Sequence, residues 1–472
     1  MRNSQIASAP PVREPFLDRN PFGYGRRMID ITELRTRVSG SVLSADDEGF
    51  AAEVAGFNLA IEHDPDVAVV AATTADVVEA VLFARELALP VEVQSTGHGA
   101  HRRITEGVLV STRRLIAVKL DPATRIATVG AGARWSRVIA AGAPLGLAPV
   151  GGSAPAVGVV GYLIGGGFGP LVRSHGASSD YVRGFTVVTG AGEVVEASAD
   201  ENPDLFWALR GGKTGLGIVT EVRLELVELP SLYAGSLLFE NQHIEKVLRG
   251  WFDYTATADP AVSTSVVMLR FPPIDAVPEP MRGKNFAALR FAYPGEIGEG
   301  RRLAAPLRAL APVFIDSLGE LPIDEVGLIH NDPEGPSPAW SNGTLLSHAN
   351  ADLASAVLAA AGPNTRVPFV AAELRHLGSA LATDVPEESA VGGRSARYAI
   401  VLIAAPEPSL FDRVVPEAAN AVFEAIRPWI NAESNINFSA LGGAGTPNWS
   451  PETTERLAAV RKRHDPDRVF AH

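Results

Sequence analysis

The fold of this chain is decided by one glycine-rich stretch, residues 151–169, which reads GGSAPAVGVVGYLIGGGFG. It belongs to a longer segment, from Val138 to Val172, that contains no charged residue. If this segment binds a diphosphate, its backbone amides must supply the hydrogen-bond donors, and glycine lets those amides approach the ligand. A long glycine-rich loop inside a compact domain is uncommon unless it is functional. We therefore expect buried main chain arranged around a ligand.

Two other structures were weighed for the same segment. A membrane-spanning helix must satisfy its backbone hydrogen bonds internally, and the prolines at 144, 149 and 155 together with the many glycines oppose such a helix. A loop-rich edge of the hydrophobic core stays open as the alternative to a ligand site. We expect no membrane segment here.

A second glycine-rich element, residues 94–101, reads QSTGHGAH and follows a strand predicted at Val91–Val93. Small residues flank His98 on both sides. Successive backbone amides in such a loop can form an anion-binding nest. Taken alone, the pattern is equally consistent with a turn that carries a solvated histidine.

A third element, residues 202–220, reads NPDLFWALRGGKTGLGIVT. It predicts a short helix, a glycine-rich loop over Arg210–Gly217, and then a strand. Alone, it would pass for an ordinary helix–loop–strand unit.

The residues before these loops predict an α/β unit. Val67–Val70 is a short apolar strand, and a helix follows with Thr74 as its N-cap and negative charge in its first turn. Pro90 ends this helix. Further elements are expected as strands at 107–111, 125–129, 184–197 (two strands joined by a turn) and 218–227, and as helices at 135–141 and 203–209.

Around Pro230 the pattern changes. Residues 237–428 mix amphipathic helices with separated strands, which predicts an antiparallel sheet with covering helices. The helices are expected at 244–254, 299–310 and 416–426, with Pro416 at the first position of its helix, and strands at 286–293 and 398–404.

The composition limits the classes of protein. The 472 residues are 46% hydrophobic, which suggests two or three domains with a large core. A net charge of −13 gives no field that attracts nucleic acid or an anionic membrane, so we expect neither partner. Cysteine is absent, which excludes disulfides and thiolate sites and makes the cytoplasm the simplest compartment. An Arg26–Arg27 pair lacks a following apolar run, so we expect no twin-arginine export signal.

Together, the three glycine-rich elements resemble the PCMH-type FAD-binding domain of the vanillyl-alcohol oxidase superfamily, and more narrowly the berberine-bridge-enzyme-like and 6-hydroxynicotine-oxidase-like FAD-linked oxidases. The resemblance covers residues 55–230 and resumes at 461–470, RKRHDPDRVF, with a weak match at 373–380, ELRHLGSA. It implies an α+β fold in four parts: an N-terminal extension (1–45), a two-subdomain FAD-binding domain (46–230), a substrate-binding domain with an antiparallel sheet covered by helices (231–428), and a C-terminal segment that returns to the FAD domain (429–472).

By this resemblance, His98 is the residue that bonds covalently to the 8α-methyl group of FAD. A neutral imidazole is a competent nucleophile, and the flanking glycines leave room for the ring. His101 is the competing candidate. The other residues that the resemblance assigns to the cofactor come mainly from the three glycine-rich elements: Ser95, Thr96, Gly97, Gly99, Ala100, Gly152, Ser153, Ala154, Gly158, Gly161, Tyr162, Gly165, Gly166, Gly169, Val219 and Asn437.

The chain departs from the family pattern at three places. Ala154 stands where some relatives have a second, cysteinyl link, so the flavin can be linked only once. Tyr162 replaces a histidine that often lies near the ribityl chain and the pyrimidine edge. Residues 435–438 read Asn-Ile-Asn-Phe instead of Tyr-x-Asn-Tyr, so Asn437 is kept but both tyrosines, one of which lies near the flavin, are missing.

Proton abstraction must then come from elsewhere, or the substrate must need little help. The best local candidates are Glu373, Arg375 and His376. On a strand, Glu373 and Arg375 share one face, and His376 points to the other. A simple salt-bridged pair is equally consistent with this pattern. Tyr398 is a further candidate, with a packed aromatic residue as the alternative.

Two other kinds of site find little support. A Rossmann dinucleotide site needs G-x-G-x-x-G, and GAGARW at 130–135 lacks the third glycine. A zinc site would need a third ligand beside His98 and His101, and none is evident, so we expect no metal.

The resemblance implies an oxidase that takes a hydride from a small molecule and passes the electrons to O₂, giving H₂O₂. The substrate could be an alcohol, a sugar, an amine or a specialised metabolite, and a homodimer is compatible. The alternatives are a flavin-dependent dehydrogenase or oxygenase, or a low-turnover resistance protein that sequesters a ligand.

Overall fold

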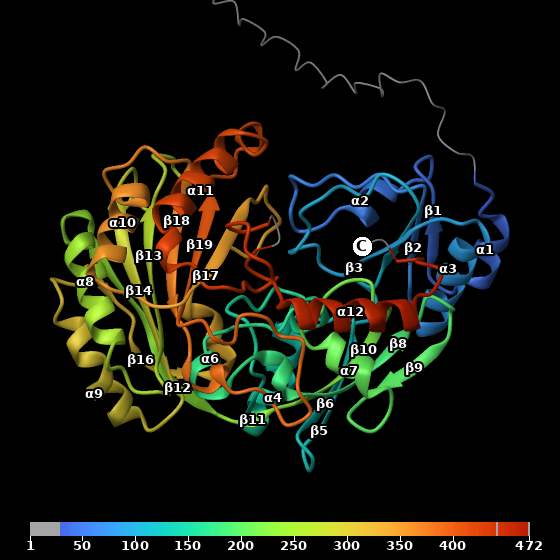
Figure 1. Ribbon diagram of the computed structural model, residues 1–472, viewed down its shortest axis with the longest axis horizontal. Coiled ribbons are helices and arrows are strands. Elements are labelled where there is room, and N and C mark those ends of the chain that lie inside the picture. Colours follow the sequence, from blue (N-terminus) through green and yellow to red (C-terminus); the bar gives the residue numbers. More distant parts are fainter. Residues whose placement is uncertain (1–28, 440–441, 471–472) are drawn as a thin grey trace, which may run out of the picture.

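In the described part of the chain, three large β-sheets, a two-stranded pair and surrounding helices form two halves that lie side by side (Figure 1). The computed structural model describes residues 29–439 and 442–470. The Arg26–Arg27 pair and most of the predicted N-terminal extension therefore lie outside the described residues. The mixture of helices and largely antiparallel sheets confirms the predicted α+β class. The predicted domain limits stay a prediction.

The first sheet carries the beginning of the chain and has the order β1-β2-β4-β3. Its strands are β1 (Ser41–Leu43), β2 (Val67–Val70), β3 (Val91–Gln94) and β4 (Val108–Ser111). Strands β2, β4 and β3 are parallel, and every residue of β2 and β4 is buried, as the apolar runs predict. The helices of this part are α1 (Thr32–Arg37), α2 (Phe50–Val54) and α3 (Thr74–Glu86).

The prediction for the start of α3 was wrong by one residue. The N-cap is Thr73, whose hydroxyl accepts from the Asp76 amide at 3.2 Å, while the Asp76 carboxylate accepts from the Thr73 amide at 3.1 Å. This reciprocal pair is a capping box, and it leaves Thr74 as the first helical residue. The negative charge that was expected in the first turn is the partner in that box.

The second sheet is antiparallel, with the order β5-β6-β10-β8-β9. Its strands are β5 (Val118–Asp121), β6 (Ile126–Gly130), β8 (Val182–Val188), β9 (Val194–Ala197) and β10 (Ile218–Glu225). Strand β5 was not predicted because its residues alternate between half-buried and exposed without an apolar run. The predicted strand 218–227 is interrupted, and its last residue belongs to a separate short pair formed by β11 (Val227–Glu228) and β7 (Leu147–Ala148).

Short helices surround this sheet: α4 (Trp135–Gly142), α5 (Val159–Leu163), α6 (Val172–His175) and α7 (Pro203–Leu209). The charge-free segment runs through α4 and α5. Its apolar residues join one core with the buried face of the second sheet. No helix among the described residues is long and apolar enough to cross a membrane.

The third sheet has eight strands in the order β15-β12-β14-β13-β18-β19-β17, with β16 also paired to β12. They are β12 (Ser231–Glu240), β13 (Ser263–Arg270), β14 (Asn285–Tyr293), β15 (Ile315–Asp316), β16 (Gly319–Pro322), β17 (Ser341–Leu346), β18 (Phe369–His376) and β19 (Tyr398–Ala404). One face packs against α8 (Ile244–Thr255), α9 (Ile297–Arg308), α10 (Ala351–Ala361) and α11 (Val414–Ala425). Pro416 is the third residue of α11, not the first as predicted.

The last described residues cross back to the first half of the molecule (Figure 1). Helix α12 (Pro451–His464) lies against α7, and Arg461 donates to the carbonyls of Gly212 and Thr214. Beyond α12, the Val91 amide of β3 donates to the Val469 carbonyl at 2.7 Å. The segment between α11 and α12 therefore passes from the large sheet to the glycine-rich loops.

Candidate active site

The loop that carries His98 leaves strand β3 in a conformation that only glycine permits. Gly97 has φ +74°, and a Cβ there would come within 2.5 Å of the Gly56 Cα. The buried Gln94 side chain holds the start of the loop. Its amide donates to the Val54 carbonyl at 3.1 Å, and its Oε1 lies 3.0 Å from His63 Nε2. The backbone of residues 95–99 is thus fixed by buried contacts at its start.

The structure distinguishes His98 from His101. His98 is half-buried, its ring stacks on Phe57 with 3.7 Å between centroids, and its Nδ1 lies 2.8 Å from the Thr96 hydroxyl. Burial, with a smaller contribution from the charge of Arg134, lowers the pKa of His98 to about 4. His98 is therefore neutral near pH 7, whereas His101 is exposed, with its Nδ1 3.2 Å from the Gly99 carbonyl.

The main chain around His98 has free hydrogen-bond donors. Within the described part of the chain, the amides of residues 96–99 and of Gly158, Val160 and Gly161 donate to no protein acceptor. Gly158 lies beside the loop, since a Cβ there would be 3.3 Å from the Ser95 hydroxyl oxygen, which is itself buried without a partner. A Cβ on Gly161 would meet nothing within 4 Å. Free amides, an unpartnered hydroxyl and open space fit an anionic ligand that runs between the loop and α5, as a diphosphate-bearing flavin requires.

The C-terminal end of α5 is held by side chains from two distant segments. Asn437 donates to the Tyr162 carbonyl at 2.9 Å, and Asn435 donates to the Gly165 carbonyl at 3.2 Å. Lys213 donates to the Gly161 carbonyl at 2.7 Å and to Asn437 Oδ1 at 2.9 Å. Sequence reasoning missed Lys213 because it lies in the third element, far along the chain from α5.

Tyr162 is enclosed between the glycine-rich segments. Its ring meets Trp135 edge-on with 5.9 Å between centroids, and a Cβ on Gly152 would touch its ring at 3.1 Å. Burial raises the pKa of Tyr162 to about 12, although the charge of Arg375 opposes the shift. The phenol therefore stays protonated and can donate a hydrogen bond, but it is not available as a base at neutral pH.

Across from α5, the large sheet presents a cluster around Glu373, whose side chain is 3% exposed. One carboxylate oxygen accepts from Arg290 at 2.5 Å and from the Ser265 hydroxyl at 2.8 Å, and the other accepts from Arg375 at 2.7 Å and 2.9 Å. His330 lies 3.7 Å away. Burial alone would raise the pKa of Glu373, but the two arginines outweigh it and hold that pKa well below its usual range.

Arg375 connects this cluster to the glycine-rich half. Its guanidinium lies 5.6 Å from the centre of the Phe438 ring, and its charge acts on Tyr162. Nε and Nη2 both donate to Glu373, whereas Nη1 donates to none of the residues that the structure describes. A small cavity of about 30 Å³ lies between Phe168, Arg290 and Arg375.

The other two catalytic candidates face away from Glu373. As predicted from the strand period, His376 points to the opposite face of β18, where it lies 3.1 Å from Arg173 Nη1 and stacks on Tyr398 at 5.1 Å. Burial and the nearby arginines lower the pKa of His376 to about 2. The Tyr398 hydroxyl meets the Thr255 hydroxyl at 2.8 Å within the helix-covered core. Their surroundings are those of packed residues.

The remaining cofactor candidates divide between two environments. Gly165 and Gly166 are buried and Gly169 is half-buried, and a Cβ on Gly165 would collide with Asn437. Val219 is buried on β10 opposite Val187. The others lie half-buried or exposed around the loop and the start of the charge-free segment: Ala100, Gly152, Ser153 and Ala154.

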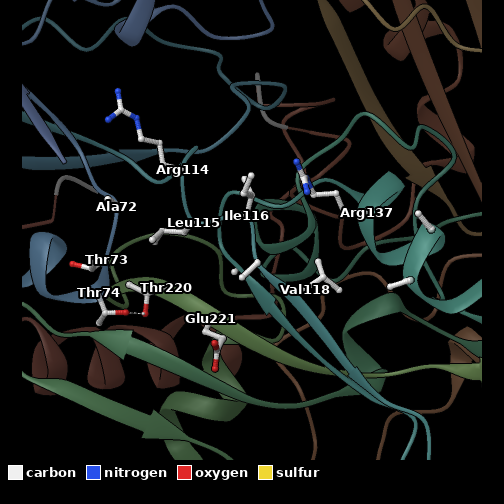
Figure 2. Close-up of a pocket in the computed structure, with 14 residues that line it drawn as sticks. Ala72, Thr73, Thr74, Arg114, Leu115, Ile116, Val118, Arg137, Thr220 and Glu221 are labelled. Carbon is white, nitrogen blue, oxygen red and sulfur yellow. Dashed lines mark hydrogen bonds between the residues drawn. The ribbon is translucent and has the colours of Figure 1, made fainter. Parts of the chain in front are cut away.

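A further cavity is separate from this arrangement. It is an open groove of about 710 Å³ between the start of α3, residues 114–118, α4 and β10. Figure 2 shows Arg114 and Arg137 on its rim and the hydrogen bond between the Thr74 and Thr220 hydroxyls on its floor. It contains none of the predicted site residues. Among the described residues, no three His, Asp or Glu side chains are grouped as metal ligands.

Comparisons with known proteins agree with this geometry. Residues 65–198 match the family described as FAD binding domain. The chain is 26% identical to (R)-6-hydroxynicotine oxidase of Paenarthrobacter nicotinovorans over 92% of this chain and 96% of that protein. The crystal structure of 6-hydroxy-D-nicotine oxidase from Arthrobacter nicotinovorans superposes with a TM-score of 0.80 at 25% identity, covering 92% of this chain and 97% of that one.

A further solved structure shares the fold at 21% identity. It is glucooligosaccharide oxidase from Acremonium strictum, with a TM-score of 0.74 over 92% of this chain and 96% of that one, and it carries a 6-S-cysteinyl, 8α-N1-histidyl FAD. The loop, the glycine-rich segment and the sheet of this chain therefore have counterparts in flavoenzymes. The chain is an FAD-dependent oxidoreductase that contains an FAD-binding domain, and it is similar in sequence and fold to 6-hydroxynicotine oxidase and similar in fold to the berberine-bridge-like oxidases.

Proposed function

We propose that this enzyme carries its FAD on His98 through a single covalent bond and oxidises a small molecule bound between Tyr162 and Arg375. The observation that carries the proposal is the neutral His98 imidazole in a loop with free amides. A histidyl link occurs in a solved structure of the same fold, and a cysteinyl link is excluded here because the chain has no cysteine.

The bound flavin supplies the redox chemistry, accepting a hydride from the substrate and passing the electrons to O₂. The protein contributes orientation and electrostatics. Tyr162 remains protonated and can donate a hydrogen bond, and Arg375 holds a positive charge over Phe438. Glu373 acts as a positioning residue, because its two oxygens are occupied by Arg290, Arg375 and Ser265.

This arrangement favours one class of substrate. A protonated amine would find no counter-charge at Glu373, because that carboxylate is already neutralised by two arginines. The free Nη1 of Arg375 suits a hydroxyl oxygen that becomes negative when its proton is lost. The neighbouring rings of Tyr162, Phe168 and Phe438 suit a planar ring. We therefore propose an aromatic or heteroaromatic substrate that bears a hydroxyl group, which agrees with the name of the relative that matches nearly the whole chain.

An anaerobic screen tests the proposal. The flavin absorbance is followed while the oxidised enzyme is mixed with matched ring compounds that do or do not carry a hydroxyl group, and with sugars and amines. Bleaching by hydroxylated rings, with recovery of colour and release of H₂O₂ in air, is the expected result. Bleaching by sugars or amines alone contradicts the substrate class. Recovery only with an artificial electron acceptor indicates a dehydrogenase, and tight binding without bleaching indicates a sequestering protein.

Compartment and assembly are also part of the proposal. The absence of cysteine favours the cytoplasm. A homodimer is compatible with the net charge and the size of the chain, and the mass in solution tests it.

A further inference from the structure

Lys213 has an unusual backbone conformation and an amine among neutral acceptors. It lies in the glycine-rich loop between α7 and β10 with φ +64°, a left-handed conformation that L-residues rarely adopt. Its backbone amide donates to the Ile164 carbonyl at 2.9 Å, just after α5. The side chain continues in the same direction, toward the glycine-rich segment that the flavin requires. The strained backbone therefore serves to bring the amine there.

The amine is only partly satisfied. An ammonium has three donors, and Lys213 uses one for the Gly161 carbonyl and one for Asn437 Oδ1. Both acceptors are neutral, and within residues 29–439 and 442–470 no carboxylate pairs with this amine. Burial accordingly lowers the pKa of Lys213 to about 8. A half-buried cation without a counter-charge is unfavourable unless a ligand provides one.

The direction of that ligand follows from Gly161. The amide of Gly161 is free, and the space at its Cβ position is open. The Lys213 amine contacts the carbonyl of this same residue at 2.7 Å. We propose that Lys213 is the internal counter-charge of the bound cofactor, so that FAD binding and protonation of Lys213 favour each other.

Other nearby groups do not titrate in the same range. On α5, Tyr162 has a pKa of about 12, and in the loop His98 has a pKa of about 4. On α12, Arg461 donates to the carbonyls beside Lys213, and its pKa is lowered by burial from a high starting value. Asn435 and Asn437 do not ionise. Between pH 7 and pH 9, a change in FAD affinity that depends on Lys213 therefore reports the charge of its amine.

The sign of the effect follows from linkage. Below pH 8 the amine is charged without FAD and stays charged when FAD binds. Between pH 8 and the higher pKa of the complex, binding must take up a proton, so affinity falls as the pH rises. If the complex has a pKa of 10 or above, FAD binds about tenfold more weakly at pH 9 than at pH 7.

The experiment titrates FAD into apoprotein of the His98→Ala variant, in which no covalent bond can form, at pH 7 and pH 9. With Lys213 present, the dissociation constant should rise about tenfold between the two pH values. Adding Lys213→Met should weaken binding at pH 7 and remove the pH dependence. Lys213→Arg should also remove the pH dependence but keep binding tight, because the guanidinium stays charged. Lys119→Met, at an exposed lysine on β5, is the matched control and should behave like the parent.

Two further measurements locate the negative charge. ADP carries the diphosphate without the flavin ring, and the midpoint potential of the holoenzyme with His98 intact reports charge near the ring. A pH-dependent ADP affinity that disappears in Lys213→Met assigns Lys213 to the diphosphate, and a lower potential in Lys213→Met assigns it to the ring. A purely structural role would lower the melting temperature of the Lys213→Met apoprotein and leave both measurements unchanged. That outcome overturns the proposal, as does the same pH dependence with and without Lys213.

Discussion

The two surfaces that face each other across the site are built in opposite ways. On the flavin side, residues 95–99 and 158–161 present main-chain amides and small side chains. On the sheet side, Glu373 lies in a network of charged side chains from β14 and β18. A surface of main-chain amides has few degrees of freedom, so it suits a cofactor that stays bound from one turnover to the next. A surface of side chains can be altered residue by residue, which suits substrate recognition.

The largest expected effect comes from replacing His98 on the flavin side. In His98→Ala, the covalent bond to FAD should be lost completely, because His98 is the half-buried, neutral histidine of the loop and the competing His101 is exposed. The measurement is acid precipitation followed by flavin fluorescence of the pellet on a denaturing gel. Colour that stays with the His98→Ala pellet would assign the bond to another residue, with His101→Ala as the matched control that should keep it.

The same bond should form over an unusual pH range. Because the pKa of His98 is about 4, its imidazole is neutral well below the range of an ordinary histidine. Apoprotein mixed with FAD should therefore attach it at an even rate from pH 8 down to about pH 5 and lose attachment only near pH 4. A loss that begins near pH 6.5 would mean that His98 is not desolvated.

The second effect tests whether the sheet side is a balanced network. Glu373→Gln leaves Arg290 and Arg375 without their shared counter-charge in a buried place, which should destabilise the fold by about 3–5 kcal/mol. Chemical denaturation measures it. Glu424→Gln, at an exposed carboxylate on α11, should change the stability by less than about 0.5 kcal/mol. Equal effects would show that the Glu373 network adds nothing to stability.

The third effect, on the sheet side, separates the charge of Arg375 from the geometry of its hydrogen-bond donors. Arg375→Met should lower kcat/KM by roughly 100-fold, because the free Nη1 donors are lost. Arg375→Lys keeps the positive charge but not the planar guanidinium with its several donors, so it should recover only part of kcat/KM. Steady-state kinetics under air-saturated buffer provide the measurement. Full activity in Arg375→Met would remove this residue from the substrate side.

The smallest expected effect comes from Thr73, which lies outside both surfaces and gives a reference value for the stability changes. Thr73→Ala removes the cap of α3 and should cost about 1 kcal/mol of stability, whereas Thr73→Ser keeps the hydroxyl and should be nearly neutral. Thermal unfolding of the apoproteins compares the two. If Thr73→Ser is as unstable as Thr73→Ala, the capping box does not carry the effect.

The contrast also explains what could be predicted from the sequence. Glycines such as Gly97 and Gly165 are required by local conformation and close contact, so the backbone side was recognisable from its pattern. Arg290 and Lys213 were not found, because their roles arise only when β14 and β18 join the same sheet on either side of β13 and when the third glycine-rich element meets α5. Strand β5 and the Thr73 cap were missed for a related reason. The sequence signals for both are weak, and contacts with neighbouring residues decide the structure.

The pairing of β3 with Val469 has a consequence for how the protein matures. The amides of Val469 and Phe470 donate to the Asp465 carboxylate, and the Val469 carbonyl accepts from β3. The edge of the first sheet is thus completed by residues that leave the ribosome long after β3 itself. We therefore expect cofactor loading to wait until synthesis of this segment is finished, so a nascent chain released before residue 465 should accumulate without its yellow chromophore.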